Sequence, residues 1–311
     1  MFLFEKEQFV YDIAGTRVGG HPGEHPTVLA GTIFYGGHKI VKDPVRGDFD
    51  KKAAESLINS QEELSDTTGN PRMVQVFAET SEAMLKFLGF TADLSDAPFL
   101  IDSADPLVRV SGLHYAEEVG FLDRAIYNSL NVSATKEERE ALWNMQHECA
   151  IILAFNPQDP SIAGKRGVLD DGTITLERGL LALAEDLGIK KPLIDTATMA
   201  MGAGAGSSAS FTFVAKTLYG HPVGAGIHNA PSSWSWLRKI RKESPEVFEA
   251  CDIASNLITH TLGADFILYG PIENAERVFP VVAMADIFAA ESLRTEFGIE
   301  PIEGHPINKL L

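Results

Sequence analysis

Short runs of apolar residues alternate with longer amphipathic stretches along almost the whole chain. Eight of these runs have the length and bounding residues of buried strands. They are Val28–Phe34, Met73–Phe77, Pro98–Ile101, Arg124–Tyr127, Ala150–Phe155, Pro192–Ile194, Val223–Ile227 and Phe266–Tyr269. Because apolar strands that alternate with helices are typical of a parallel sheet covered by helices, the pattern predicts an α/β fold.

The stretches between the apolar runs carry helix patterns and helix start signals. Asp105 and Ser244 are capping residues that each precede a first-turn proline, and Thr135 with Glu138 matches a capping box. Further helices are expected over Lys51–Asp66, Ser81–Phe90, Leu176–Leu187, Ser210–Leu218 and Phe279–Phe297. A helix is therefore predicted after each strand.

Eight strands that are each followed by a helix predict a (β/α)8 TIM barrel. The chain of 311 residues is long enough, since such barrels need roughly 250 residues. A doubly wound open sheet is the alternative. The sequence contains no linker rich in Pro, Ser or charge and no short repeat, so residues 1–311 are expected to form a single domain.

The composition narrows the function classes. A formal net charge of −17 argues against nucleic acid and anionic lipid as partners. Two cysteines indicate a reducing compartment without a disulfide framework. Charged residues interrupt any signal-peptide core at the N-terminus, and the two long uncharged runs are rich in Gly, Ser and Thr or contain Pro and His. We therefore expect a cytoplasmic chain with no transmembrane segment of its own.

Carboxylate or amide side chains follow five of the eight predicted strands. They are Asp102, Asn128, Asn156, Asp195 and Asn229. Any one of them could simply mark a turn, but the carboxyl ends of barrel strands converge on one face, where active sites lie. A carboxylate accepts two parallel N–H groups, and asparagine both donates and accepts. The set therefore fits the amino-pyrimidinone edge of a pterin ring.

Two other motifs point to chemistry that the rest of the sequence does not support. The segment from Gly204 to Ala209 matches a dinucleotide fingerprint, but it lacks a strand directly before it and an acid about 20 residues after it. His147, Cys149 and Cys251 resemble a zinc ligand set, but the first two precede a strand and belong at the opposite end of the barrel. Neither a dinucleotide site nor a metal site is predicted.

A local positive stretch interrupts the acidic chain. Residues 196–242 contain no Asp or Glu. The cations within this stretch are Lys216, Arg238, Lys239, Arg241 and Lys242. The stretch could be a solvated helix face, a site for the anionic tail of a pterin, or a docking surface for an acidic partner.

Seven segments closely resemble the family formed by the H subunit of tetrahydromethanopterin S-methyltransferase. They are GTIFYGGHKIV, SDTTGNP, FLIDS, AIYNS, ILAFNPQDP, GIHNAPSSWSWLR and LYGPIENA. The resemblance extends from the first residues to the terminal KLL. More distantly, the chain is similar to the pterin-binding barrel methyltransferases, which include methyltetrahydrofolate:corrinoid methyltransferase and dihydropteroate synthase. The fold that this resemblance implies is again a (β/α)8 barrel.

The resemblance also implies a set of site residues. The implied pterin contacts are Asp102, Asn128, Ser129, Asn156, Asp195 and Asn229. Asn229 would stabilise charge at the pterin N5, and Asp102 or Asp195 would relay a proton through water. His228 stands where dihydropteroate synthase has a lysine, which argues against synthase activity.

The implied reaction is transfer of the N5-methyl group of methyl-tetrahydromethanopterin to the Co(I) corrinoid of a partner subunit, in methanogenesis. The resemblance implies a homodimer, peripheral attachment to a membrane complex, and no tightly bound cofactor on this chain. A methyltetrahydrofolate:corrinoid methyltransferase and a non-catalytic docking subunit are the alternatives.

Overall fold

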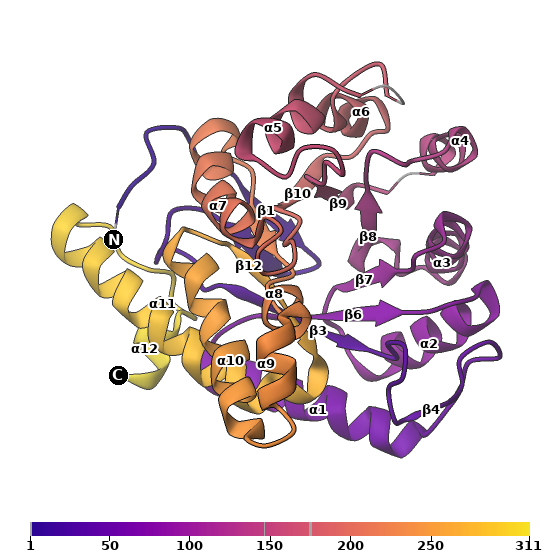
Figure 1. Cartoon of the computed structure of the whole chain (residues 1–311), viewed down its shortest axis with the longest axis horizontal. Helices are drawn as coiled ribbons and strands as arrows, with labels where there is room; N and C mark the ends of the chain where they lie inside the picture. The colour runs from indigo at the N-terminus through magenta and orange to yellow at the C-terminus, as the bar shows by residue number, and fades with distance from the viewer. Residues whose placement is uncertain (1, 146, 174–175) are drawn as a thin grey trace.

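The computed structural model describes residues 2–145, 147–173 and 176–311, and these residues form a closed barrel of eight parallel strands surrounded by helices (Figure 1). Around the barrel the strands are β3 (Val28–Ile33), β6 (Arg72–Phe77), β7 (Phe99–Asp102), β8 (Ala125–Leu130), β9 (Cys149–Leu153), β10 (Lys191–Asp195), β11 (Val223–Ala225) and β12 (Phe266–Pro271). β12 pairs with β3 and closes the barrel. The predicted TIM barrel is confirmed, and the open sheet is excluded.

Helices follow the barrel strands on the outside. They are α1 (Lys51–Thr68), α2 (Ser81–Leu94), α3 (Pro106–Val119), α4 (Lys136–Asn144), α5 (Ile162–Asp170), α6 (Leu180–Asp186), α7 (Ala205–Tyr219), α8 (Asn229–Ser233), α9 (Ser235–Ile240), α10 (Pro245–Thr261), α11 (Ala275–Phe297) and α12 (Pro306–Leu310). Asp105 caps α3, and Thr135 with Glu138 forms the predicted capping box of α4. Ser244 makes no side-chain cap on α10. Helix α5 was not predicted.

A β-hairpin closes the N-terminal end of the barrel. Its strands β1 (Val10–Ile13) and β2 (Thr16–Gly19) pair antiparallel, and both were missed in the sequence. Ile13 and Val18 are fully buried and share a hydrophobic cluster with inward-facing barrel residues. A second small hairpin, β4 (Val41–Asp43) and β5 (Asp48–Phe49), follows β3 and was also missed.

Side chains fill the barrel interior and the layer between barrel and helices. Along β3, Val28 and Ala30 belong to the interior cluster, whereas Leu29 packs with Phe279 of α11. This alternation follows from the two-residue period of a strand. Because the interior is packed, a ligand can bind only at an end of the barrel. In the described part of the chain, each helix is too short or too polar to cross a membrane.

Candidate active site

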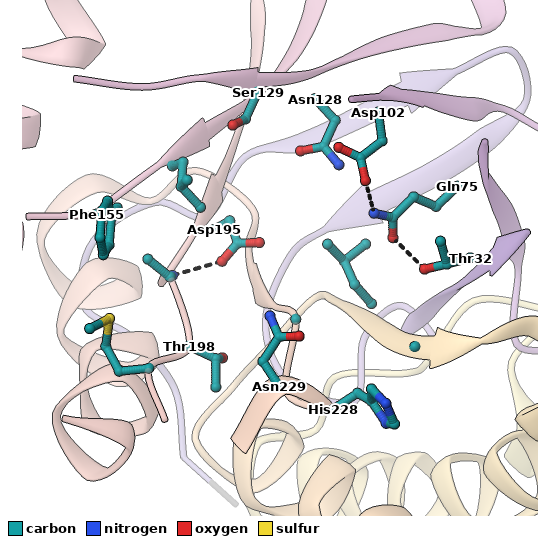
Figure 2. Close-up of a pocket in the computed structure, with 16 residues that line it drawn as sticks. Thr32, Gln75, Asp102, Asn128, Ser129, Phe155, Asp195, Thr198, His228 and Asn229 are labelled. Atoms are coloured by element: carbon teal, nitrogen blue, oxygen red, sulfur yellow. Dashed lines mark hydrogen bonds between the residues drawn. The ribbon is translucent and has the colours of Figure 1, made fainter. Parts of the chain in front are cut away.

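A cavity of about 420 Å³ opens at the carboxyl end of the barrel strands (Figure 2). The ends of all eight barrel strands, or the loops that follow them, contribute to its lining. Five of the six predicted site residues lie here: Asp102, Asn128, Ser129, Asp195 and Asn229. Side chains that lie far apart in the sequence therefore meet around one space.

The strands bring these residues together in slightly different ways than the sequence predicts. Asp102 and Asp195 end their strands as expected. Asn128 and Ser129 lie within β8, where the register with β9 shifts, so two consecutive residues line the cavity. Strand β11 ends at Ala225, so Asn229 does not directly follow a strand and is instead the first residue of α8.

Asn156 does not line the cavity. Its Oδ1 accepts hydrogen bonds from the backbone N–H groups of Gln158 (3.0 Å) and Asp159 (3.2 Å), and its Nδ2 donates to the carbonyl of Gly164 at 3.2 Å. The side chain therefore organises the turn after β9, which is the ordinary role of asparagine in loops. The predicted contact of Asn156 with the substrate has no support in this geometry.

Asp102 is held by a chain of side chains that was not predicted. Gln75 Nε2 donates to Asp102 Oδ2 at 2.6 Å, and Thr32 Oγ1 donates to Gln75 Oε1 at 3.0 Å (Figure 2). Burial raises the pKa of Asp102 to about 6, and the bond from Gln75 opposes this shift. The only sequence signal for Thr32 and Gln75 was a polar residue at an inward-facing position of an apolar strand.

Asp195 is held by the backbone that follows it. The N–H of Ala197 donates to Asp195 Oδ1 at 2.7 Å. Behind this turn, the buried Lys165 Nζ donates to the carbonyls of Thr196 (2.8 Å) and Ala197 (3.2 Å). Burial raises the pKa of Asp195 to about 6, which the Ala197 N–H and the Lys165 charge oppose and the Asp102 charge increases. Burial lowers the pKa of Lys165 to about 8.

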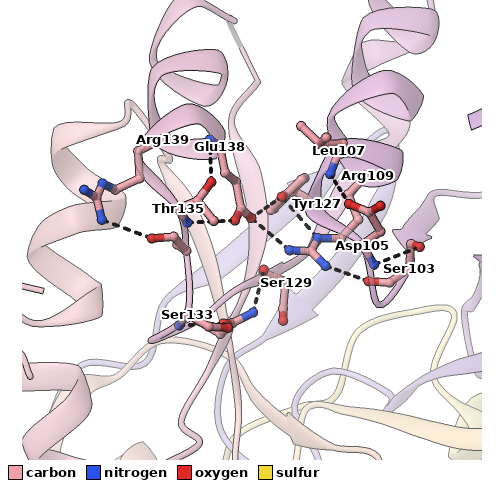
Figure 3. Close-up of polar contacts among 12 residues, drawn as sticks. Ser103, Asp105, Leu107, Arg109, Tyr127, Ser129, Ser133, Thr135, Glu138 and Arg139 are labelled. Carbon is pink, nitrogen blue, oxygen red and sulfur yellow. Dashed lines mark hydrogen bonds and ion pairs between the residues drawn. The ribbon is translucent and has the colours of Figure 1, made fainter. Parts of the chain in front are cut away.

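A buried network behind the cavity supports both β7 and β8 (Figure 3). Arg109 on α3 donates to the carbonyl of Ser103 at 2.6 Å, to the hydroxyl of Tyr127 at 3.1 Å and to Glu138 at 2.9 Å. Tyr127 also donates to Glu138. Since Ser103 follows Asp102 and Tyr127 precedes Asn128, this network fixes the backbone next to two cavity residues.

Comparisons with known proteins identify the family. The family model described as "Tetrahydromethanopterin S-methyltransferase MtrH subunit" matches residues 6–302. The chain belongs to this methyltransferase family. It is 54% identical to the H subunit of tetrahydromethanopterin S-methyltransferase from Methanothermobacter marburgensis and 48% identical to that from Methanocaldococcus jannaschii, with full coverage of both chains in each case. It is also 50% identical, with full coverage of both, to the H subunit of the putative methyltransferase mtx from Methanosarcina mazei.

Solved structures of dihydropteroate synthases share the fold of this MtrH family member. The enzyme from Xanthomonas albilineans with 4-aminobenzoic acid superimposes with a TM-score of 0.59 at 15% identity, covering 91% of this chain and 98% of that one. The Yersinia pestis enzyme gives a TM-score of 0.59 at 11% identity, covering 90% and 98%. At such identities the likeness concerns the barrel architecture alone.

The residues of the other two motifs of this MtrH family member do not line the cavity. Helix α7 begins at Ala205 after a loop, so the glycine motif lacks the strand that dinucleotide binding requires. Cys149 is buried on β9 at its N-terminal end, and Cys251 lies on α10. Among residues 2–145, 147–173 and 176–311, no three His, Cys, Asp or Glu side chains are grouped to hold a metal ion.

Proposed function

We propose that this chain binds methyl-tetrahydromethanopterin in the cavity at the carboxyl end of the barrel and promotes transfer of its N5-methyl group to the Co(I) corrinoid of a partner subunit. The observation that carries the proposal is the convergence of two carboxylates and two amides, Asp102, Asp195, Asn128 and Asn229, on one cavity in a member of this family.

The two carboxylates suit the donor edge of a pterin. The exocyclic amine and a ring N–H present two parallel donors, which one carboxylate accepts together. Asp102 is partly buried and Asp195 is buried, and protein donors already orient both, so little side-chain freedom is lost when the ring binds. Asn128 and Ser129 add neutral donors and acceptors for the mixed edges of the ring.

The chemical difficulty lies at the leaving nitrogen. The corrinoid supplies a Co(I) nucleophile, so this chain has no need of a nucleophile of its own. As the C–N bond breaks, N5 keeps the electron pair and must receive a proton or a strong hydrogen bond. Asn229 donates an amide N–H there without titrating. Asp102 or Asp195 passes a proton through water, since a group with a pKa of about 6 exchanges protons readily near neutral pH.

The relatives are named as subunits of tetrahydromethanopterin S-methyltransferase, which supports a role in a multi-subunit enzyme. We propose that residues 1–311 act as one domain, that the chain works as a homodimer, and that it attaches peripherally to a membrane complex on the cytoplasmic side. The corrinoid-carrying subunit then docks over the open end of the barrel, where the methyl group must face it.

The direct test mixes the purified protein with methyl-tetrahydromethanopterin and reduced cobalamin and follows the loss of the Co(I) absorbance. Asn229→Ala should lower the rate by about 10²-fold, the cost of removing one donor to developing charge. Asn59→Ala is the matched control, because this asparagine is exposed on α1 and lies outside the cavity, and it should retain full turnover. Wild-type protein that binds the pterin without turnover would favour a docking role. Wild-type protein that prefers methyltetrahydrofolate would identify the folate, and not methyl-tetrahydromethanopterin, as the methyl donor.

A further inference from the structure

A second cavity of about 470 Å³ lies beside the first at the same end of the barrel. Its lining comes from the loop after β3, from His228 and Arg241 in the segment between β11 and α10, from α10 itself, and from residues at and after the end of β12. His228 lines both cavities, and the adjacent residues Gly270 and Pro271 line the first and the second respectively. The two spaces are therefore neighbours that share a wall around His228.

The shared wall is fixed by hydrogen bonds and by packing. The Nδ1 atom of His228 lies 2.8 Å from Oδ1 and 3.0 Å from Oδ2 of the buried Asp252. Asn274 Nδ2 donates to the same carboxylate at 3.4 Å. Gly270 has a φ of +85°, and a Cβ atom there would lie 2.5 Å from Cγ of His228. The imidazole thus occupies the space that a side chain at position 270 would need.

The carboxylates of the second cavity are already engaged with protein partners. Asp252 is paired with His228. Glu273 accepts a 2.8 Å hydrogen bond from the hydroxyl of Tyr35, and Glu249 pairs with Arg277 at 3.2 Å. Their negative charge is therefore partly compensated within the protein.

Two cations of the cavity have no such compensation. The guanidinium of Arg241 lies over the ring of Phe248, 4.4 Å from its centroid, which holds it in place. Lys39 faces the same cavity from the loop after β3. Within the described residues, no carboxylate lies within ion-pair distance of either side chain. Arg241 belongs to the stretch 196–242, which lacks acidic residues.

We propose that this second cavity binds the acidic substituent of the pterin whose ring occupies the first cavity, with Arg241 and Lys39 as the groups that bind its anionic end. The inference rests on the proposed function. A cavity of about 420 Å³ suits a bicyclic ring, so the remainder of a larger substrate must extend out of it. The neighbouring cavity on the other side of His228 offers unpaired positive charge. Guanidinium and ammonium groups recognise carboxylate and phosphate by charge-assisted hydrogen bonds.

The test compares two ligands by calorimetry. Methyl-tetrahydromethanopterin carries the acidic substituent, and 5,6-dimethyltetrahydropterin has the same kind of ring with an N5-methyl group but no acidic substituent. Wild type should bind the first more tightly, and this advantage should shrink as the salt concentration rises. Arg241→Gln should weaken binding of the full substrate by about tenfold, the worth of one charge-assisted hydrogen bond, and leave binding of the ring alone unchanged.

Matched variants separate binding from folding. Lys242→Gln removes the neighbouring positive charge, which does not line the cavity, and should leave both affinities unchanged. Arg241→Lys keeps the charge and should recover part of the lost affinity. Equal effects of Arg241→Gln on the affinities for both ligands, or no effect on either affinity, would overturn the inference. The inference would also fail if Arg241→Gln weakened only the binding of a partner subunit and left both ligand affinities unchanged. Wild type that binds neither ligand would instead overturn the proposed function.

Discussion

Gln75 Nε2 donates a 2.6 Å hydrogen bond to Oδ2 of Asp102, and the carboxylate sets the direction of this bond. An ionised carboxylate only accepts hydrogen bonds, so the amide nitrogen of Gln75 must face Asp102. The amide oxygen then faces Thr32, whose hydroxyl donates to it at 3.0 Å. A relay from β3 through β6 to β7 therefore supports the ionised form of Asp102.

Removing the middle of this relay should shift the pH dependence of ligand binding. Burial already raises the pKa of Asp102 to about 6, and Gln75→Leu removes the bond that opposes the shift. The pKa of Asp102 should rise further, so pterin binding should weaken at a higher pH than in wild type. Calorimetry between pH 5 and pH 8 measures this shift.

Thr32 provides the control for the same relay. Thr32→Ser keeps the hydroxyl donor and should keep the wild-type pH profile, whereas Thr32→Val should shift it in the same direction as Gln75→Leu. Identical profiles for wild type, Thr32→Val and Gln75→Leu would show that the relay does not control Asp102.

Neutralising Asp102 tests its contact with the ring. Asp102→Asn preserves the shape of the side chain but replaces one acceptor oxygen by a donor. We expect pterin binding to weaken by about 1.5–3 kcal/mol, the usual contribution of a hydrogen bond to a charged group. Asp93→Asn, which makes the same change at an exposed position of α2 outside the cavity, serves as the comparison. An unchanged affinity in Asp102→Asn would remove this residue from the pterin site.

The same burial predicts a gain in stability when a carboxylate is neutralised. Burial raises the pKa of Asp195 from 3.8 to about 6, so the folded state binds its proton more tightly than the unfolded state. The stabilisation from the protonated group is complete below about pH 4 and is lost as the pH rises through about 6. Asp195→Asn should therefore stabilise the fold at pH 7.5, by up to about 3 kcal/mol, and less at pH 4.

Denaturant unfolding at the two pH values measures this difference. The introduced amide would still accept the N–H of Ala197 through its side-chain oxygen, so the turn after β10 is retained. Equal or lower stability of Asp195→Asn at pH 7.5 would contradict the electrostatic account of this site.

Removing one charged partner from the network behind β7 and β8 should lower the free energy of unfolding. Arg109→Met leaves the carboxylate of Glu138, which is 1% exposed, without its cation, and we expect a loss of about 3–5 kcal/mol. Adding Glu138→Gln should recover part of the loss, because the uncompensated charge is then removed. The exposed pair of Lys136 and Glu140 is the control, and Lys136→Ala should leave the unfolding midpoint almost unchanged.

The barrel and much of the site could be predicted from the sequence because both follow from local patterns. A buried strand is a run of apolar residues, and its end is marked by the first polar one, which identified Asp102 and Asp195. The hairpin of β1 and β2 was missed because its strands are four residues each and Ile13 and Val18 are the only apolar side chains of these strands that are deeply buried.

Contacts between distant residues could not be predicted from the same patterns. The relay from Thr32 through Gln75 depends on the register of three neighbouring strands, which a single strand pattern does not contain. Asn156 and Asn229 both follow apolar runs, yet one organises a turn and the other begins α8 and lines the cavity. Only the paths of their loops distinguish these two asparagines.

The most direct measurement is a crystal structure of the protein with bound methyl-tetrahydromethanopterin. The account predicts the pterin ring inside the 420 Å³ cavity, with its amine edge on Asp102 or Asp195 and its N5 within hydrogen-bond reach of Asn229. A ring bound anywhere else on the molecule, with these three polar side chains making no contact to it, would contradict the account.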